Sequence, residues 1–142
     1  MDIIFKIKPQ TKGRPRARVI NGKYATMYTP TSTRKYEEEI KQQYIDNGAP
    51  HFKDSLLKAS VTFCFKIPKS TSAKNRDKIL SKRTYYAKKK YDLDNLLKSL
   101  FDALNGIAYD DDCQVARITA DKIYGGEDMI FLTLEEIEND TD

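Results

Sequence analysis

The sequence predicts an α+β fold, with one small domain in which a mixed β-sheet carries two main helices. Three observations point to this class. Strand-like apolar segments lie towards both ends of the chain, two longer segments have a helical period, and no repeat or composition break divides the sequence. The 142 residues are enough for one domain with a core and too few for two. Residues 1–142 are therefore expected to form a single domain.

The first part of the chain is expected to contain a strand, a hairpin and a helix. Residues 3–8 alternate imperfectly between apolar and polar side chains, which indicates a strand. A basic loop over residues 10–18 follows this strand. Asn21-Gly22 stands between two apolar-rich runs within residues 18–28, which is typical of a hairpin with a type I′ turn. Residues 29–48 have the pattern of a helix that ends at a glycine.

The middle of the chain combines a strand, a basic segment and a second helix. Residues 57–68 are rich in β-branched and aromatic residues and end at a proline, which predicts a strand. Residues 69–90 contain few apolar side chains and are expected to be part helix and part loop. Residues 93–105 place six apolar side chains on one helical face, so this helix is expected to pack on the sheet.

The last third of the chain is expected to add two strands. Residues 114–125 and 128–137 read as strands that are joined at Gly125-Gly126. Residues 138–142 form an acidic tail that is expected to fray.

Composition excludes several classes of protein. His51 is the only histidine, and Cys64 and Cys113 are the only cysteines. These counts exclude nucleases that need a histidine cluster, Ser-His-Asp hydrolases and Cys/His zinc sites. They also give no sign of a disulfide framework. Because no apolar run approaches the roughly 20 residues of a membrane helix and no signal peptide is apparent, we expect a cytoplasmic protein without a membrane partner.

Charge is distributed unevenly along the chain. Residues 1–36 have a net charge of +8 and residues 65–91 a net charge of +9, whereas residues 92–142 have a net charge of −11. An extended polyanion such as DNA would be attracted to the first two segments and repelled by the last. The bland alternative is that the lysines are merely a solvated surface.

Six aspartates lie within residues 91–115. On a helical wheel of residues 93–105, Asp94, Lys98 and Asp102 share one narrow side with two amides, opposite the apolar face. Each acid has an ordinary explanation as well. Asp92 can cap the helix, Asp94 and Lys98 can form an i,i+4 ion pair, and residues 110–112 can be a polar loop.

Convergence of Asp92, Asp94 and Asp112 would crowd like charges together, and a hard divalent cation would relieve that repulsion. Mg²⁺ suits carboxylate oxygens plus waters, and Mn²⁺ is the expected substitute. Such an ion can polarise a phosphodiester and activate water. Lys98, one turn from Asp94, is positioned to stabilise charge that develops on the phosphorus oxygens.

The stretch Asp92-Leu93-Asp94-Asn95-Leu96, followed by Lys98, Asp102-Ala103-Leu104, Asp111-Asp112 and Gln114-Val115, resembles the signature of the RusA family of Holliday-junction resolvases. The segment KGRPRARVINGKYATMYTP is similar to the N-terminal part of many phage-borne relatives. The resemblance implies a RusA-like fold in a homodimeric, Mg²⁺-dependent endodeoxyribonuclease of DNA recombination and repair. Such an enzyme binds four-way junctions and nicks two opposed strands symmetrically.

Carried onto this sequence, the resemblance implies that Asp92, Asp94 and Asp112 bind the metal and that Lys98 is catalytic. Asn95 and Asp102 are the expected supporting neighbours. Tyr91 departs from the family pattern, in which Pro or Arg is common at this position. Three aspartates run together at 110–112, so the choice of Asp112 rests on its spacing from Gln114-Val115, and Asp111 is the second choice.

The resemblance also gives the basic segments a role. The residues expected to contact DNA phosphates are Lys12, Arg14, Arg16, Arg18, Lys88, Lys89 and Lys90. Tyr85 and Tyr86 beside them can stack on exposed bases or pack in the core.

Two other functions compete with a junction-cutting enzyme. One is a non-catalytic protein that binds junction or duplex DNA and holds a structural metal. The other is a PD-(D/E)xK nuclease, suggested by Glu39-Ile40-Lys41 and disfavoured because that element belongs on a strand and here lies in a helical pattern. Metal-dependent nicking separates the first competitor from the enzyme. Whether the protein serves a phage or its host is left open by the sequence.

Overall fold

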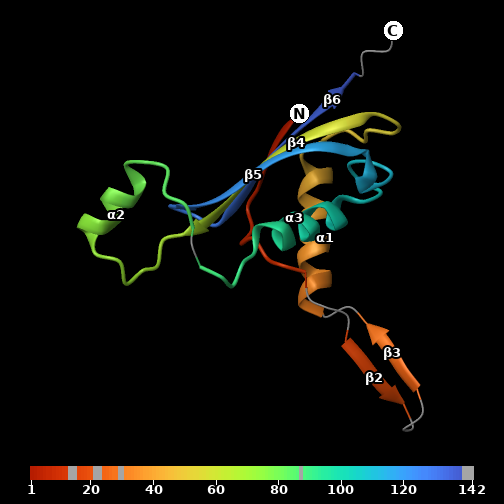
Figure 1. Ribbon diagram of the computed structural model, residues 1–142, viewed down its shortest axis with the longest axis horizontal. Helices are drawn as coiled ribbons and strands as arrows, with labels where there is room; N and C mark the ends of the chain where they lie inside the picture. Colours follow the sequence, from red (N-terminus) through yellow and green to blue (C-terminus); the bar gives the residue numbers. More distant parts are fainter. Residues whose placement is uncertain (13–15, 21–23, 29–30, 87, 139–142) are drawn as a thin grey trace.

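A mixed four-stranded sheet forms the centre of the protein in a computed structural model (Figure 1). The structure describes residues 1–12, 16–20, 24–28, 31–86 and 88–138, and between 16 and 28 it describes the backbone alone. In the order β1-β6-β4-β5, the strands are β1 (Asp2–Phe5), β6 (Met129–Ile137), β4 (Leu56–Lys66) and β5 (Val115–Gly125). β4 is parallel to β5 and antiparallel to β6, while β1 is antiparallel to β6. The predicted mixed sheet is confirmed.

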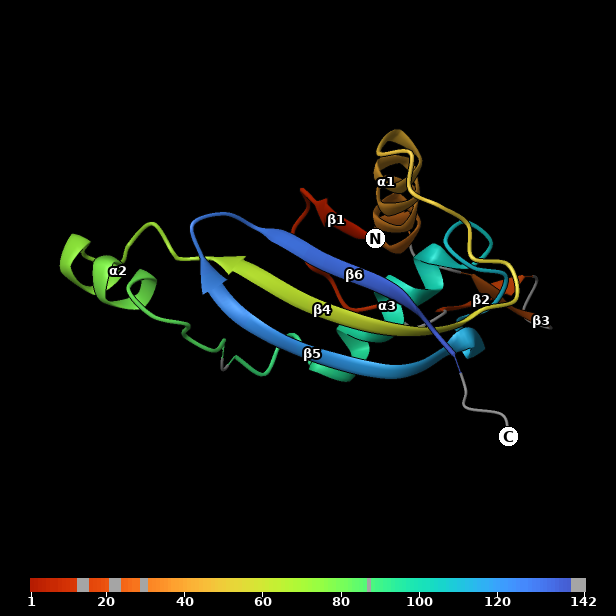
Figure 2. The same ribbon diagram turned by 90° about the horizontal axis from the view of Figure 1, so that it is seen from above.

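Two helices cover one face of this sheet, as Figures 1 and 2 show. They are α1 (Thr31–Asp46) and α3 (Leu93–Leu104), and α3 lies in the connection between the parallel strands β4 and β5. Inward-facing side chains of α3 such as Leu96 and Leu100 are fully buried. Burial of each such side chain stabilises the fold by about 1.5–3 kcal/mol.

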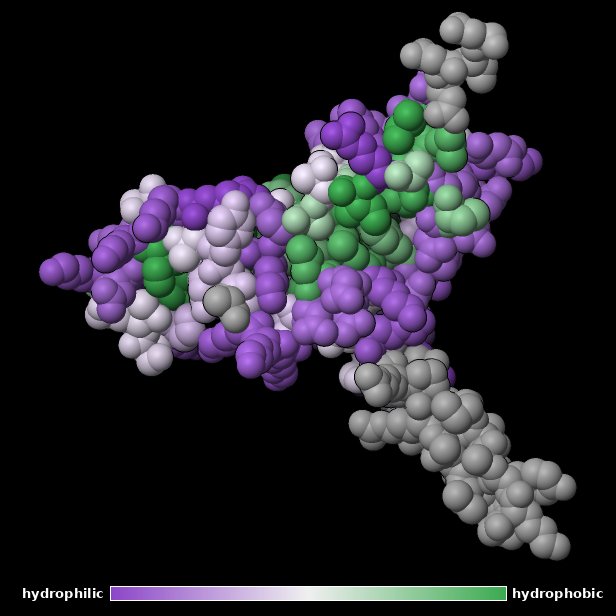
Figure 3. Space-filling view, in the orientation of Figure 1, coloured by the Kyte–Doolittle hydropathy of each residue, from purple (hydrophilic) through white to green (hydrophobic). Residues whose placement is uncertain are grey.

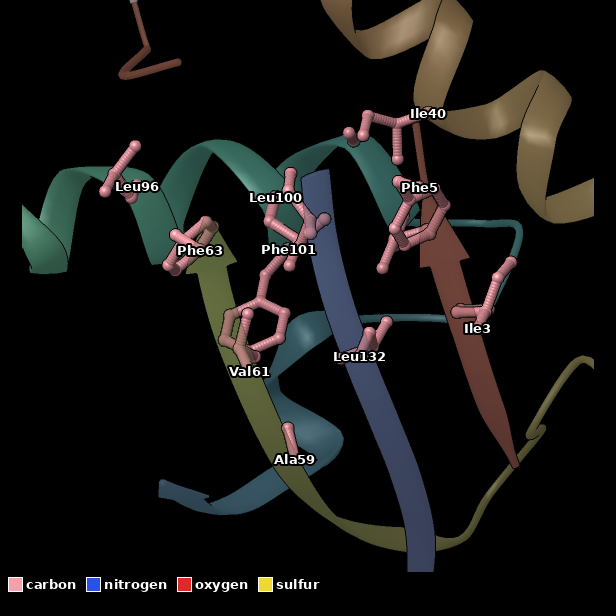
Figure 4. Packing of buried hydrophobic residues seen from close by; sticks show 14 of the residues in the cluster. Ile3, Phe5, Ile40, Ala59, Val61, Phe63, Leu96, Leu100, Phe101 and Leu132 are labelled. Atoms are coloured by element: carbon pink, nitrogen blue, oxygen red, sulfur yellow. The ribbon is translucent and has the colours of Figure 1, made fainter. Parts of the chain in front are cut away.

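The core lies between the two helices and the sheet (Figure 4). Alternate residues of β4, namely Ala59, Val61 and Phe63, point into it, as period-2 alternation requires. Cys64 is also buried. Glu39-Ile40-Lys41 lies within α1 rather than on a strand, so the PD-(D/E)xK interpretation is excluded.

The basic segment between β4 and α3 leaves the sheet and returns to it. We call residues 67–91 the arm. It contains the short helix α2 (Ala73–Leu80), which the Ser72 Oγ caps by accepting a hydrogen bond from the backbone N–H of Asn75 at 3.3 Å. No side chain of α2 is buried, and the arm extends beyond the end of the sheet (Figures 1 and 2). The prediction of part helix and part loop is confirmed.

The predicted hairpin is formed by β2 (Arg16–Ile20) and β3 (Tyr24–Tyr28), which pair antiparallel. It projects from the molecule on the side away from the arm (Figure 1). The predicted type I′ turn at Asn21-Gly22 lies outside the described residues, as does the predicted fraying of residues 139–142.

Gly125 ends β5 at a close approach between neighbouring strands. A Cβ atom at this position would lie 2.1 Å from the Cys64 Sγ, so a larger residue would require the Cys64 side chain or the neighbouring backbone to shift. Gly125 therefore has a packing reason at the predicted join, whereas a Cβ at Gly126 would meet open space.

Within the described ranges, no helix is long and apolar enough to cross a membrane.

Candidate active site

The side of α3 that faces away from the core carries a row of charged residues. Asp94 and Lys98 are exposed and Asp102 is partly buried, at successive i,i+4 positions. The opposite face, with Leu96 and Leu100, is buried. The two faces predicted from the helical wheel are confirmed.

At the N-terminal end of α3, Asp92 precedes the first helical residue without capping the helix. Its side chain makes no capping hydrogen bond; instead its Oδ2 accepts a hydrogen bond of 3.1 Å from the Asn95 Nδ2. In the part of the chain that the structure describes, Asp94 and Lys98 form no salt bridge, either with each other or with another residue. Asp92 and Asp94 are exposed, and no lysine or arginine among the residues that the structure describes forms a salt bridge with either carboxylate.

At the C-terminal end of α3, a second acidic group forms where the next loop returns to the helix. The Asp112 backbone N–H donates a hydrogen bond of 3.0 Å to the Asn105 Oδ1, which holds Asp112 beside the helix. Lys12 reaches the same place, and its Nζ lies 2.8 Å from the Asp102 Oδ2.

The carboxyls of this second group differ in pKa for physical reasons. Burial raises the pKa of Asp112, and the adjacent carboxylates of Asp111 and Asp102 raise the pKa further. In contrast, a hydrogen bond from the backbone N–H of Cys113 lowers the pKa of Asp111. Of these two carboxyls, Asp112 is therefore the one whose charged form is disfavoured, and a nearby cation would stabilise that form.

The other two aspartates of the loop hold the loop in shape. The Asp110 Oδ1 lies 2.6 Å from the His51 Nε2, and the His51 Nδ1 lies 3.0 Å from the carbonyl oxygen of Ile107. Asp111 caps a short 3₁₀ helix, Asp112–Gln114, by accepting the Cys113 N–H at 2.9 Å. These contacts favour Asp112 over Asp111 as the free carboxylate at this end of the site.

Gln114 fixes this loop to the rest of the domain with both ends of its amide. Its Oε1 accepts hydrogen bonds from the backbone N–H groups of Asp110 and Asp111 at 2.9 and 3.2 Å. Its Nε2 donates to the carbonyl oxygens of Phe52 and Ser55 at 2.9 and 3.0 Å. Gln114 therefore holds in place the loop that carries Asp112.

We expect the substitution Gln114→Ala to lower DNA nicking by roughly 10–100-fold, the cost typical of removing an outer-shell partner of a metal ligand. The backbone N–H groups of Asp110 and Asp111 would lose their acceptor, and Asp112 would no longer be held against α3. Single-turnover nicking assays measure the effect. Gln42→Ala is the matched control, because the Gln42 amide is exposed and bonds only Asp46 within the described residues. Equal activity of Gln114→Ala and the control would contradict the positioning role.

The predicted metal ligands lie in two groups in this structure. Asp112 is beside Asp102, whereas Asp94 lies two helical turns further along α3, a rise of about 12 Å. Among the described residues, no group of three or more His, Cys, Asp or Glu side chains is arranged to hold a metal ion. A shared metal at Asp92, Asp94 and Asp112 therefore stays a prediction.

The predicted DNA contacts fall into three sets. Lys88, Lys89 and Lys90 are exposed on the arm just before α3. Lys12 is bound in the ion pair with Asp102, so it stands at the acidic site rather than on open surface. Arg14 lies outside the described residues, as do the side chains of Arg16 and Arg18, whose backbone belongs to β2.

The two alternatives for Tyr85 and Tyr86 are resolved by their environment. Tyr86 is 8% exposed and stacks on Phe65 with ring centroids 4.2 Å apart, so it packs in the core. Tyr85 is 63% exposed, so it does not pack in the core.

The pairing of His51 with Asp110 was not predicted from the sequence. The two residues lie 59 positions apart, so no local pattern connects them.

The mixed sheet, the acidic side of α3 and the basic arm define a small α+β protein with a carboxylate-based site beside a cationic surface. Residues 6–135 match the family described as "Endodeoxyribonuclease RusA", and the chain belongs to this family. The family consists of endodeoxyribonucleases that act on branched DNA, so the predicted enzyme class, DNA partner and RusA-like fold are confirmed at this level. The chain is also 29% identical over 135 residues to "Uncharacterized protein YqaN" of Bacillus subtilis (strain 168), which covers 92% of each chain.

Proposed function

We propose that this protein is a Mg²⁺-dependent, structure-selective endodeoxyribonuclease that resolves four-way DNA junctions by paired, symmetric nicks. One observation carries the proposal. In a chain of an endodeoxyribonuclease family, α3 presents Asp94 and Lys98 on its exposed side, where neither forms a salt bridge with a described residue, and Asp112 lies against its other end. Free carboxylates with one lysine among them are the residue types that phosphodiester hydrolysis requires.

The chemistry of these side chains fits a divalent cation. Asp92, Asp94 and Asp112 offer only carboxylate oxygens, and burial together with the neighbouring carboxylates of Asp111 and Asp102 raises the pKa of Asp112, a shift that a bound cation would oppose. These three residues are proposed to hold Mg²⁺, with Mn²⁺ as the substitute and Asp111 as the second choice for the loop ligand. When bound, Mg²⁺ would polarise the phosphodiester and favour hydroxide over water.

The remaining steps are proposed for the chain's own residues. Lys98 would place its ammonium where charge develops on the phosphoryl oxygens as the P–O bond breaks. Asn95 would keep Asp92 oriented through the hydrogen bond of 3.1 Å between their side chains. Asp102 would hold Lys12 at the edge of the site through their 2.8 Å ion pair.

DNA binding is proposed for the basic surfaces at either side of α3. Lys88, Lys89 and Lys90 are exposed immediately before Asp92, so a strand that contacts them would pass directly into the acidic site. Arg16 and Arg18 belong to the projecting hairpin, and Arg14 precedes it. Arm and hairpin extend in different directions from α3, which suits a branched substrate better than a single straight duplex (Figure 1).

The direct test is to incubate the purified protein with a synthetic four-way junction, with and without Mg²⁺. We expect two nicks at symmetry-related positions only when Mg²⁺ is present, and binding without cleavage in EDTA. The salt dependence of binding in EDTA reports the number of phosphate contacts, at roughly 0.9 in log–log slope for each duplex contact. Binding that is never followed by metal-dependent nicking would instead make this a junction-binding protein that does no chemistry.

A symmetric homodimer is proposed as the working unit, because one chain supplies one site and a junction must be cut twice. Support comes from the edge of the sheet. β5 is an edge strand, and an apolar area of surface lies over β5 and α3 (Figure 3). Ile118 of β5 is 45% exposed. Edge strands with exposed apolar side chains are open to pairing with another chain.

We expect Ile118→Glu to convert the dimer to a monomer in analytical ultracentrifugation, because the dimer would bury a charge on β5. Ile45→Glu on α1 is the matched control, since Ile45 is 54% exposed and lies away from β5, and this variant should stay dimeric. A wild-type protein that sediments as a monomer at concentrations supporting paired nicking would exclude the dimer.

A further inference from the structure

A cavity of about 300 Å³ lies where the two ends of the arm meet the sheet. Its lining includes Phe65 at the end of β4, Lys69 where the arm departs, and Lys88 where it returns. Tyr91, which directly precedes Asp92, packs its ring 4.9 Å from the Phe65 ring. Tyr91 therefore links the cavity to the candidate active site, because its ring packs on Phe65 of the cavity lining and its backbone continues into Asp92.

One wall of this cavity is aromatic. Tyr86 stacks on Phe65, and the Tyr124 ring centroid lies 5.0 Å from that of Tyr86. Tyr86 and Phe65 are buried, whereas Tyr124 is only partly buried. Backbone hydrogen bonds of 2.9 Å, from Tyr86 N to Lys122 O and from Tyr124 N to Thr84 O, fix the arm against β5. The aromatic wall is thus a rigid surface with one ring, Tyr124, open to a ligand.

The rest of the lining is strongly cationic. Four lysines contribute to it, namely Lys8, Lys66, Lys69 and Lys88. Asp128 is the one acid of the lining, and its Oδ1 already accepts a hydrogen bond of 2.8 Å from the backbone N–H of Lys66. Lys69 and Lys88 are exposed, and no described residue forms a salt bridge with either. A ligand of this cavity should therefore be an anion with an aromatic part.

We propose that this cavity binds one unpaired nucleotide of the DNA strand beside the cleaved phosphodiester, with its base against Tyr124 and its phosphate against Lys69 and Lys88. The inference rests on the proposed nuclease function and adds a binding site to it. A volume of about 300 Å³ is at the lower limit of the roughly 300–1,000 Å³ typical of ligand pockets, which suits one nucleotide better than a base pair. A base must leave its stack to enter, so the cavity would select strands with unpaired or strained nucleotides, as at a branch point.

The test uses the wild-type protein in EDTA, so that binding is measured without cleavage. The probe is a gapped duplex with 2-aminopurine at the unpaired position, and intact duplex of the same sequence is the reference. Stacking on Tyr124 should quench the 2-aminopurine fluorescence. We expect Tyr124→Leu to lose the quenching and to bind the gapped DNA about tenfold more weakly, with duplex affinity unchanged. Tyr124→Phe, which keeps the ring, should behave as the wild type does.

A second pair of variants keeps the test decisive if Tyr124→Leu fails to fold. The double substitution Lys69→Ala/Lys88→Ala removes two exposed charges from the cavity, and Lys74→Ala/Lys78→Ala removes two exposed charges from α2 of the same arm. The first double variant should weaken binding of the gapped DNA more than the second. Equal losses of affinity for the gapped DNA in the two double variants would overturn the proposal, and so would unchanged quenching with Tyr124→Leu. Tighter binding of a free deoxynucleoside monophosphate than of the gapped DNA would overturn it as well. Failure of the nuclease function would be recognised separately, as absence of Mg²⁺-dependent nicking by the wild type.

Discussion

Asp112→Asn is expected to lower junction nicking by more than about 100-fold while leaving junction affinity within about threefold. The amide keeps the shape of the side chain and removes the charge that a divalent cation would need. Loss of a metal ligand should exceed the roughly 10–100-fold cost of losing an outer-shell partner. Single-turnover nicking and gel-shift titration in EDTA measure the two quantities.

Asp111→Asn is the matched control for this prediction. Its carboxylate caps the 3₁₀ helix by accepting the Cys113 N–H, which an amide oxygen can also accept, so most of the nicking activity should remain. If Asp111→Asn abolished nicking and Asp112→Asn did not, the assignment of the loop ligand would have to move by one residue. Normal activity in both variants would remove the loop from the metal site.

The same substitution has a second readout in stability. A carboxyl whose pKa is raised in the folded state stabilises the fold below its ordinary pKa, and that contribution is lost as pH rises through the folded pKa. Asp112 is such a group, because burial and the neighbouring carboxylates disfavour its charged form. The thermal unfolding midpoint of Asp112→Asn should therefore exceed that of the wild type at neutral pH, and the difference should disappear in acid.

Lys98→Ala is expected to lower turnover by about 10²–10³-fold, the range seen when one stabiliser of transition-state charge is removed, with little loss of junction affinity. Lys98 is exposed on α3 and forms no salt bridge with any described residue, so its removal should leave the folded state nearly unchanged. Pre-steady-state nicking at saturating protein separates turnover from binding.

Lys35→Ala is the control for Lys98, because it removes an exposed lysine from α1. Its activity should match that of the wild type. Equal losses of affinity and turnover in Lys98→Ala would make Lys98 a DNA-binding residue, and unchanged turnover would leave it with no role in the reaction.

Local patterns in the sequence were sufficient to predict most of the elements. The helical period of residues 93–105 gave both faces of α3, because about 3.6 residues per turn place Asp94 and Lys98 on the side opposite Leu96 and Leu100. Strand pairing was not predictable in the same way. Nothing in β4 indicates that it lies between β5 and β6, because a strand's neighbours depend on which other segments bury their apolar faces with it.

The site was predictable in its residues more than in its geometry. The motif pointed to the acids of α3 and to Asp112, yet the ion pair between Lys12 and Asp102 joins residues 90 positions apart and has no sequence signal. The tyrosines show the same limit. Tyr85 and Tyr86 are adjacent and chemically identical, and only the position of Phe65 on β4 decides which of them packs in the core.

The pairing of β1 with β6 has a consequence for the synthesis of this protein. The carbonyl oxygen of Met1 accepts a hydrogen bond from the backbone N–H of Leu134 at 3.0 Å, 133 residues further along, so β1 can pair only after β6 has been made. Ile130 and Leu132 of β6 belong to the same core as the buried side chains of α3. The helix that carries the acids therefore cannot complete its packing before β6 is present. Contacts between such distant segments form late and slowly. A nascent chain that has not yet reached β6 therefore carries no assembled candidate site.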